Sequence, residues 1–374
     1  MNINDLTLSY SEKAVFSLRA LYSKRGYSQY KMSKFEEYDL YANNKDFLIS
    51  DSVITFTDNG KLMALKPDVT LSIVKNSADS SSTVQKVYYN ENVYRASKGT
   101  GSFKEIMQVG LECIGNIDDY NICEVITLAA ESLMSISQDC VLDISHLGLI
   151  ASVLDSLGIP ESIEAELLRC IGDKNVHDLS SICVAAGVSA EKTDILKRLV
   201  MACGCPRDIL PALKEMLSGI ADTAAITQLS GIIDAITDSR IKDIIRIDFS
   251  VVDDINYYNG IVFKGFINGV PSAVLSGGQY DKLMQKMGRK SGAIGFAVYL
   301  DMLERLEGTS QEYDVDVVLL YGGNTDIKTL NACVKDVLNS GKTVAAQREI
   351  PLNIKYKQLI KLTDSGVEKL ENNA

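Results

Sequence analysis

The sequence predicts an α+β fold followed by a small α/β unit. Stretches in which apolar and polar residues alternate lie on both sides of a long region with helical periodicity, between residue 115 and about 232. An Asn-Gly pair at 59–60 separates two of these stretches, which is typical of a hairpin between antiparallel strands. The final segment shows strand, helix and strand patterns in turn. Strands and helices that are segregated along most of the chain predict the α+β class.

The N-terminal part begins with a predicted helix at 8–26, where apolar residues recur at helical spacing until a glycine. Residues 53–57 and 62–65 form the predicted hairpin strands around the Asn-Gly turn. Two longer strands are predicted at 84–95 and 104–115. We expect them to pair, because only a short loop separates them.

The later elements follow the same rules. Strand patterns return at 244–251 and 260–266, and a helix is expected to begin near Gly292. The terminal segment predicts a buried strand at 315–321, followed by a helix at 327–338. Further strands are predicted at 343–346 and 357–363.

Composition narrows the class of protein. A chain of 374 residues with 46% hydrophobic residues predicts two or three globular domains. It contains no run of 18 or more apolar residues and no recognisable export signal, so we expect a cytoplasmic protein without membrane contact. The net charge of −11 makes tRNA binding unlikely, because phosphate recognition usually needs a basic surface.

Neither a metal nor a cofactor is expected. His146 and His177 are the only histidines, and neither has acids or cysteines at metal-ligand spacing. The eight cysteines are scattered, as in a reduced cytosolic protein. The pair Gly322-Gly323 lacks the remaining residues of a phosphate-binding loop.

The strand at 104–113 carries the most suggestive side chains. Alternation places Gln108, Gly110 and Glu112 on one face, while the opposite face is apolar. A glycine between an amide and a carboxylate leaves room for a small ligand that both could contact. From the spacing alone, a strand with one solvated face is the commoner explanation.

Several motifs resemble the histidyl-tRNA synthetase group of class II synthetases. Ser-Gly-Gly-Gln-Tyr-Asp at 276–281, with Gly-Phe-Ala-Val-Tyr-Leu-Asp-Met at 295–302, resembles motif 3 of that group. Gln-Val-Gly-Leu-Glu at 108–112 resembles its histidine-pocket strand. Leu-Lys-Pro-Asp-Val-Thr at 65–70 is similar to its Arg-Pro-Glu-Gly-Thr loop, and the segment at 256–263 to its Asp-Tyr-Tyr-Thr-Gly segment.

The resemblance implies an architecture. Residues 1–310 would form a class II synthetase-like domain, with a mainly antiparallel sheet flanked by helices and a helical insertion at about 140–240. Residues 313–374 would form a truncated α/β domain similar to the anticodon-binding domain. The group's fold also implies a homodimer through motif 1, although Ser33 replaces the proline of that motif.

The resemblance also implies a ligand pocket for histidine or a similar amino acid. A carboxylate and a phenol suit an imidazole, which donates from one nitrogen and accepts at the other. Arg95 occupies the position of the motif-2 arginine. The implied pocket residues are Asp68, Thr70, Arg95, Gln108, Glu112, Tyr257 and Tyr258.

The departures from the group indicate that catalysis is lost. Three positions that carry arginines in the synthetases hold Asp253, Ser102 and Met302, and Ser97 replaces an acid that reads adenine. Amino-acid activation builds negative charge on a phosphate, which preorganised cations stabilise. We therefore expect no catalytic residues and no enzymatic activity in this chain.

The segment from 144 to 160 resembles a catalytically inactive branch of the group, the regulatory subunit of ATP phosphoribosyltransferase. This resemblance implies a partner, the short catalytic subunit of the transferase, in the first step of histidine biosynthesis. The chain would activate that subunit within a hetero-oligomer and confer feedback by histidine. Whether histidine binds in the predicted pocket or at the subunit interface stays open.

Two alternatives remain at this point. The chain could be a divergent histidyl-tRNA synthetase that activates histidine with ATP. It could also be another catalytically silent synthetase paralogue that binds an amino acid. Asp253 and Met302 favour the regulatory function over the first alternative.

Overall fold

The computed structural model describes residues 8–48, 52–79, 83–97, 101–252, 257–306, 313–363 and 365–373. The chain divides into two compact units, Met1–Leu306 and Glu307–Ala374. The candidate site lies entirely in the first unit.

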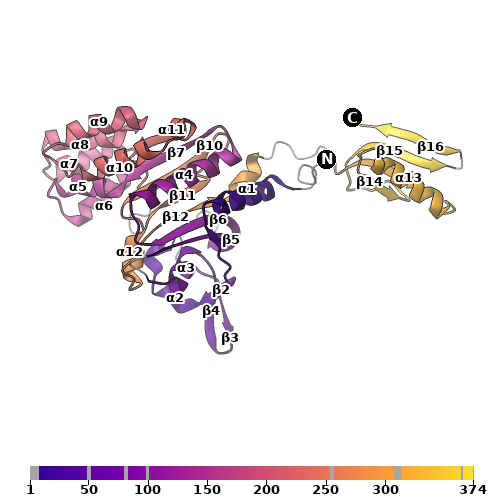
Figure 1. Cartoon of the computed structure of the whole chain (residues 1–374), viewed down its shortest axis with the longest axis horizontal. Coiled ribbons are helices and arrows are strands. Elements are labelled where there is room, and N and C mark those ends of the chain that lie inside the picture. The colour runs from indigo at the N-terminus through magenta and orange to yellow at the C-terminus, as the bar shows by residue number, and fades with distance from the viewer. Residues whose placement is uncertain are drawn as a thin grey trace. The chain divides into compact units, whose positions relative to one another are not determined.

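The first unit is built on a nine-stranded sheet with the order β1-β5-β6-β12-β11-β10-β7-β9-β8 (Figure 1). Among the described pairs of this sheet, only β1/β5 and β7/β9 are parallel, so the expected mainly antiparallel α+β fold is confirmed. The strands are β1 (Ser28–Gln29), β5 (Val84–Ala96), β6 (Phe103–Gly115), β7 (Cys140–His146), β8 (Cys203–Gly204), β9 (Ile245–Asp248), β10 (Ile261–Ile267), β11 (Leu275–Gln279) and β12 (Gly292–Tyr299).

One face of the sheet packs on α1 (Tyr10–Lys24) and α4 (Asp119–Ile136). Both helices begin at a capping box, which satisfies free backbone N–H groups at the helix start. The apolar face of β6 lies in this core through Val109, Leu111 and Cys113, as the alternation predicts, whereas Met107 near the strand's start stays exposed.

The opposite face of β5 and β6 carries a smaller core and the candidate site. A three-stranded sheet of order β2-β4-β3 also belongs to this part of the chain, and its β3–β4 pair is the predicted Asn-Gly hairpin. The elements are β2 (Phe35–Glu37), α2 (Tyr38–Ala42), η2 (Lys45–Phe47), β3 (Thr55–Asp58), β4 (Lys61–Leu65), α3 (Thr70–Asn76) and α12 (Asp281–Lys286), whereas η3 (Leu300–Leu306) packs beside α1 in the main core.

The helices between β7 and β9 gather at one end of the sheet, beside β7 (Figure 1). Apolar residues of these helices join the main core, so the group packs on the sheet through a continuous interior. The helices are α5 (Leu147–Asp155), α6 (Glu161–Gly172), α7 (Val176–Ala185), α8 (Ala190–Met201), α9 (Pro206–Leu217), α10 (Ala224–Ala235) and α11 (Ser239–Ile244).

Two sequence predictions are wrong in this unit. Residues 140–146, expected at the start of a helical region, form β7, in which Leu142 and Ile144 are buried on one face. Residues 292–299, expected to start a helix, form the central strand β12. The apolar run in β12 is buried on both faces and does not alternate, so its periodicity does not distinguish a strand from a helix. Burial in β7 does alternate from Cys140 to Ile144, but this seven-residue strand is short beside the long helical region that follows it.

The second unit has a four-stranded sheet of order β14-β13-β15-β16 and one described helix. The three predicted strands and the predicted helix are confirmed, whereas the fourth strand was missed because every residue in it is exposed. The elements are β13 (Val315–Tyr321), α13 (Ile327–Asn339), β14 (Val344–Gln347), β15 (Tyr356–Thr363) and β16 (Gly366–Asn372).

Candidate functional site

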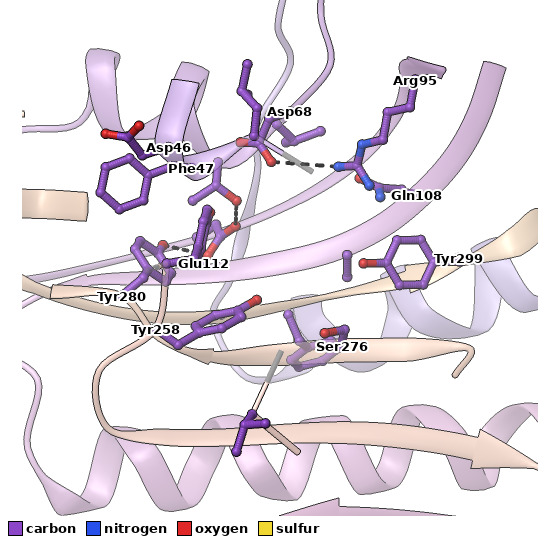
Figure 2. Close-up of a pocket in the computed structure, with 18 of the residues that line it drawn as sticks. Asp46, Phe47, Asp68, Arg95, Gln108, Glu112, Tyr258, Ser276, Tyr280 and Tyr299 are labelled. Atoms are coloured by element: carbon purple, nitrogen blue, oxygen red, sulfur yellow. Dashed lines mark hydrogen bonds and ion pairs between the residues drawn. The ribbon is translucent and has the colours of Figure 1, made fainter. Parts of the chain in front are cut away.

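A cavity of about 470 Å³ opens on the face of the sheet opposite α1 and α4. This volume falls in the range of small-molecule sites in proteins. The residues predicted from the sequence come from a loop, two neighbouring strands and the segment before β10, yet they all line this one cavity (Figure 2). They are Asp68, Thr70, Arg95, Gln108, Glu112, Tyr257 and Tyr258.

Glu112 occupies the closed end of the cavity. Glu112 is only 2% exposed, and each of its two carboxyl oxygens accepts a hydrogen bond from a hydroxyl group. Thr70 Oγ1 donates to Oε1 at 2.8 Å, and the Tyr280 hydroxyl donates to Oε2 at 2.6 Å (Figure 2). These contacts join β6 to the start of α3 and to the end of β11, so the carboxyl group is held in one orientation.

Glycines on the neighbouring strands make room for this carboxyl group. Gly295 lies directly opposite Glu112 in the β6–β12 ladder, and Gly278 lies opposite Gly295 on β11. A Cβ atom built on Gly295 would lie 1.9 Å from Glu112 Oε2, and one on Gly278 would lie 2.9 Å from a ring carbon of Tyr258. Both distances are shorter than atoms can approach, so side chains at these positions would displace the groups that line the site.

Burial controls the protonation of Glu112. Desolvation raises the pKa of this carboxyl to about 8, against the lowering effect of the hydrogen bonds from Tyr280 and Thr70. The negative charge of Asp68 raises it further. The carboxyl group is therefore largely neutral at neutral pH, and a cationic ligand group beside it would favour its ionisation.

A polar network holds the loop before α3. Asp68 accepts a hydrogen bond from the backbone N–H of Leu71 at 2.9 Å and lies 3.7 Å from the Arg95 guanidinium. Arg95 also donates from Nε to the Pro67 carbonyl at 2.7 Å. Arg95 is thus committed to the loop that carries Asp68 and Thr70.

The same loop is held from its other side by a buried ion pair. Lys66, whose side chain is fully buried, donates to Glu91 at 2.9 Å and to the Ser33 carbonyl. Burial lowers the pKa of Lys66. Removing Glu91 would leave this ammonium group buried without its counter-charge, so the pair is a requirement for the loop's position.

Aromatic rings form the wall around Glu112. Tyr257 packs against Tyr258 with ring centroids 4.8 Å apart, against Tyr280 at 5.8 Å and against Phe47 at 6.0 Å. Burial and the neighbouring carboxylates raise the pKa of Tyr257 and Tyr280 far above the usual value, so both remain neutral hydrogen-bond donors.

The space expected above Gly110 is filled. Tyr89 lies opposite Gly110 in the β5–β6 ladder, and its hydroxyl would lie 2.4 Å from a Cβ at Gly110. The glycine therefore accommodates the Tyr89 ring and not a ligand. Gln108 and Glu112 still line the cavity on either side of that ring.

Several lining residues were missed by the sequence analysis, including Phe47, Tyr89, Arg169, Tyr280 and Tyr299. Tyr89 could in principle have been predicted from the sequence, because the register of the long β5–β6 hairpin pairs it with Gly110. Tyr280 belongs to the quoted motif at 276–281, but nothing in the sequence showed that it reaches Glu112. For Arg169 we find no sequence signal.

The three positions expected to lack a cation are only partly within the described structure. Met302 packs on the main core and accepts a hydrogen bond from the Ser272 hydroxyl at 3.3 Å. Neither Met302 nor Ser102 is among the described residues that line the cavity. Asp253 lies outside the described residues.

The described residues contain no group of three His, Cys, Asp or Glu side chains that could hold a metal ion. None of the helices there is both long enough and apolar enough to cross a membrane.

The sequence model of the histidyl-tRNA synthetase family matches residues 6–303. The chain belongs to this family. The match covers the whole nine-stranded sheet, the helical group and the candidate site.

Curated relatives confirm the resemblance to the regulatory branch. A protein of Oceanobacillus iheyensis named ATP phosphoribosyltransferase regulatory subunit is 25% identical over 74% of this chain and 69% of its own length. One of the same name from Bacillus cereus is 27% identical over 83% of this chain and 76% of that protein. A histidine–tRNA ligase of Methanocaldococcus jannaschii is 29% identical over 76% of this chain and 69% of the ligase.

Solved structures confirm the class II synthetase-like fold. An ATP phosphoribosyltransferase regulatory subunit/histidyl-tRNA synthetase from Bacillus halodurans has a TM-score of 0.75 at 21% identity, covering 94% of this chain and 93% of that one. A histidyl-tRNA synthetase from Nostoc has a TM-score of 0.70 at 16% identity, covering 96% and 92%. A chain of the ATP phosphoribosyl transferase (HisG:HisZ) complex from Thermotoga maritima has a TM-score of 0.59 at 19% identity, covering 78% and 97%.

The close contact at Gly295 predicts that a side chain at this position destabilises the protein. Gly295→Ala is expected to lower the free energy of unfolding by about 1–3 kcal/mol, because the new methyl group overlaps the Glu112 carboxyl. Gly231→Ala is the matched control, since Gly231 lies in α10 with no atom within 4 Å of its Cβ position, and alanine there is expected to be neutral or stabilising. Urea unfolding measures both, and equal stabilities of the two variants would contradict the proposed contact.

The raised pKa of Glu112 predicts a pH-dependent difference in stability. Between the unfolded pKa of about 4.3 and the folded value of about 8, the folded state keeps a proton that the unfolded state has released. Glu112 therefore destabilises the protein progressively as the pH rises through this window. Glu112→Gln does not titrate, so its stability relative to wild type should rise with pH, by at most about 1.4 kcal/mol per unit.

Urea unfolding of both proteins at pH 5, 6, 7 and 8 tests this expectation, because the other titrating groups are common to both and cancel. A constant difference between the two proteins would show that Glu112 is already ionised in the folded state at low pH.

Proposed function

We propose that this chain is a non-catalytic regulatory subunit of ATP phosphoribosyltransferase that activates a short catalytic subunit and makes it responsive to histidine. The observation that carries the proposal is a cavity with polar groups suited to an amino acid, in a chain where the half-buried Met302 thioether packs against the main core and contacts Ser272. Two curated relatives with the regulatory-subunit name support it.

The cavity is proposed as the histidine site. Asp68, Glu112 and the Tyr257 and Tyr258 phenols offer acceptors and donors for an ammonium group and an imidazole ring. The ligand would be bound without being consumed, because a thioether at 302 cannot stabilise charge on a reacting phosphate as a guanidinium does. Such a site is suited to sensing the end product of a pathway.

Feedback then needs only a difference in affinity. If histidine binds the inhibited arrangement of the complex more tightly than the active one, it shifts the equilibrium by that ratio. A tenfold ratio corresponds to about 1.4 kcal/mol, the scale of one or two hydrogen bonds in the cavity. No catalytic residue in this chain takes part.

The proposal includes an assembly and a location. We infer a homodimer within a larger hetero-oligomer that contains the catalytic subunit, in the cytoplasm. The fold neighbour from the ATP phosphoribosyl transferase (HisG:HisZ) complex supports the hetero-oligomer. The net charge of −11 speaks against tRNA as a partner.

One rival function has a specific observation in its favour. The histidine–tRNA ligase of Methanocaldococcus jannaschii is as similar to this chain as the regulatory subunits are. A divergent synthetase would share the histidine pocket and would differ in its chemistry. The two functions are separated by the activation reaction.

The first test is assembly and activation. The chain should co-purify with a short ATP phosphoribosyltransferase catalytic subunit and increase its rate, and histidine should inhibit the complex. In Glu112→Gln the activation should persist while the histidine concentration for half-inhibition rises about tenfold or more, since the ligand loses a charge-assisted partner. Glu191→Gln, an exposed substitution on α8, serves as the control.

Two results would contradict this proposal in different ways. Failure to form or activate the complex would refute the regulatory function. Unchanged histidine sensitivity in Glu112→Gln would keep the regulatory function and move the sensor away from this cavity.

The second test separates the regulatory subunit from the rival synthetase. Histidine-dependent exchange between ATP and pyrophosphate should be absent in the purified chain, because the positions that stabilise the reacting phosphate lack arginine. A bona fide histidyl-tRNA synthetase assayed in parallel supplies the positive control. Robust exchange by this chain would establish the synthetase alternative instead.

A further inference from the structure

The helical group contributes one wall of the cavity. Four residues at the end of α6 line it together with Glu112, although they follow Glu112 by more than fifty positions along the chain. Their spacing places them on one side of the helix. They are Leu168, Arg169, Gly172 and Asp173.

Arg169 is the available cation of this site. Among the described lining residues only Arg95 and Arg169 carry a permanent positive charge, and Arg95 is committed to Asp68 and the Pro67 carbonyl. Arg169 is exposed to solvent, and its side chain forms no hydrogen bond or ion pair with the part of the chain that the structure describes. A guanidinium group that lines a cavity without a partner is suited to an anionic ligand group.

The backbone around Arg169 is held in place. Lys174 follows α6 directly and donates to Asp248 on β9 at 2.6 Å, which ties the end of the helix to the sheet. The Arg169 backbone carbonyl also accepts from the backbone N–H of Asp173. The guanidinium can therefore reach a ligand by rotation of its own side chain, without movement of α6.

We propose that Arg169 binds the α-carboxylate of the amino acid in this cavity, so that the bound ligand bridges the sheet and the helical group. This inference rests on the proposed function, because it takes histidine as the ligand. The charges fit a zwitterion: Glu112 and Asp68 carry the carboxyl groups on the sheet side, and the end of α6 supplies the Arg169 guanidinium, with the Asp173 carboxyl also lining the cavity there.

Through Arg169, ligand binding would act directly on the helical group. Asp68 and Glu112 belong to the sheet side of the cavity, and Arg169 is supplied by the helices that follow β7. A ligand with both a cationic and an anionic group contacts both sides. A ligand without the carboxylate contacts only the sheet side.

The test compares histidine with histidinol, in which a hydroxymethyl group replaces the carboxylate. Isothermal titration of the full chain should show tighter binding of histidine. Arg169→Gln should weaken histidine binding by about 10- to 100-fold and leave histidinol binding within about twofold, as expected for one charge-assisted interaction. Arg198→Gln, an exposed arginine on α8 that does not line the cavity, is the matched control.

A second readout reports the bridge itself. Histidine should slow amide hydrogen exchange in α6, residues 161–172, in wild type and in Arg198→Gln. Histidinol should not slow it, and histidine should not slow it in Arg169→Gln. A purely structural function of Arg169 would change exchange in α6 without ligand and would weaken both ligands alike.

The outcomes distinguish this inference from the proposed function. Tight histidine binding that is unaffected by Arg169→Gln, or a preference for histidine that is lost only in Arg95→Gln, would overturn the assignment of Arg169 and leave the histidine site intact. Absence of histidine binding to the wild-type chain and to its complex with the catalytic subunit would overturn the effector site and this inference together.

Discussion

The register of the central antiparallel strands is the constraint on which the site depends. Glu112 on β6 faces Gly295 on β12, which in turn faces Gly278 on β11, so a carboxyl side chain lies across two strands that have no side chains beneath it. A shift of one residue in this ladder would turn Glu112 toward the apolar core under α1 and α4. The cores on the two faces, each built from a different set of alternating residues, hold the register.

The site is polar but carries little free charge. Glu112 is kept largely neutral by burial, and hydroxyl groups of Thr70 and Tyr280 satisfy its oxygens. Arg95 is balanced by Asp68, as Lys66 is by Glu91. Such an arrangement favours binding through hydrogen bonds and a few new charge pairs. Among the described lining residues only Arg95 and Arg169 are permanently cationic, whereas a phosphate reaction is stabilised by several preorganised cations. This contrast is the physical basis of the regulatory function that we propose.

Membership of the histidyl-tRNA synthetase family gives the fold but does not decide between binding and catalysis, since relatives of both kinds are similar to this chain. The distinction depends on individual side chains. Met302 packs against the main core beside Ser272, and the wall of the cavity that faces away from the sheet is made by α6. A ligand in this cavity would therefore contact two parts of the structure, which is a suitable place for a sensor to couple binding to rearrangement.

Local periodicity and recognisable motifs were enough to predict the class of fold, the long strands at 84–95 and 104–115, and the polar face of β6. They also predicted those cavity-lining residues that belong to short motifs. Residues 292–299 were assigned wrongly because a strand buried on both faces lacks the alternation that marks a strand. Residues 140–146 were assigned wrongly because a seven-residue strand is short beside the helical region that follows it. Only the tertiary structure decided that Tyr89 fills the space above Gly110 and that Arg169 reaches the cavity. Those contacts join residues far apart in the chain or across a ladder, and they are set by strand register and helix packing, which no local pattern encodes.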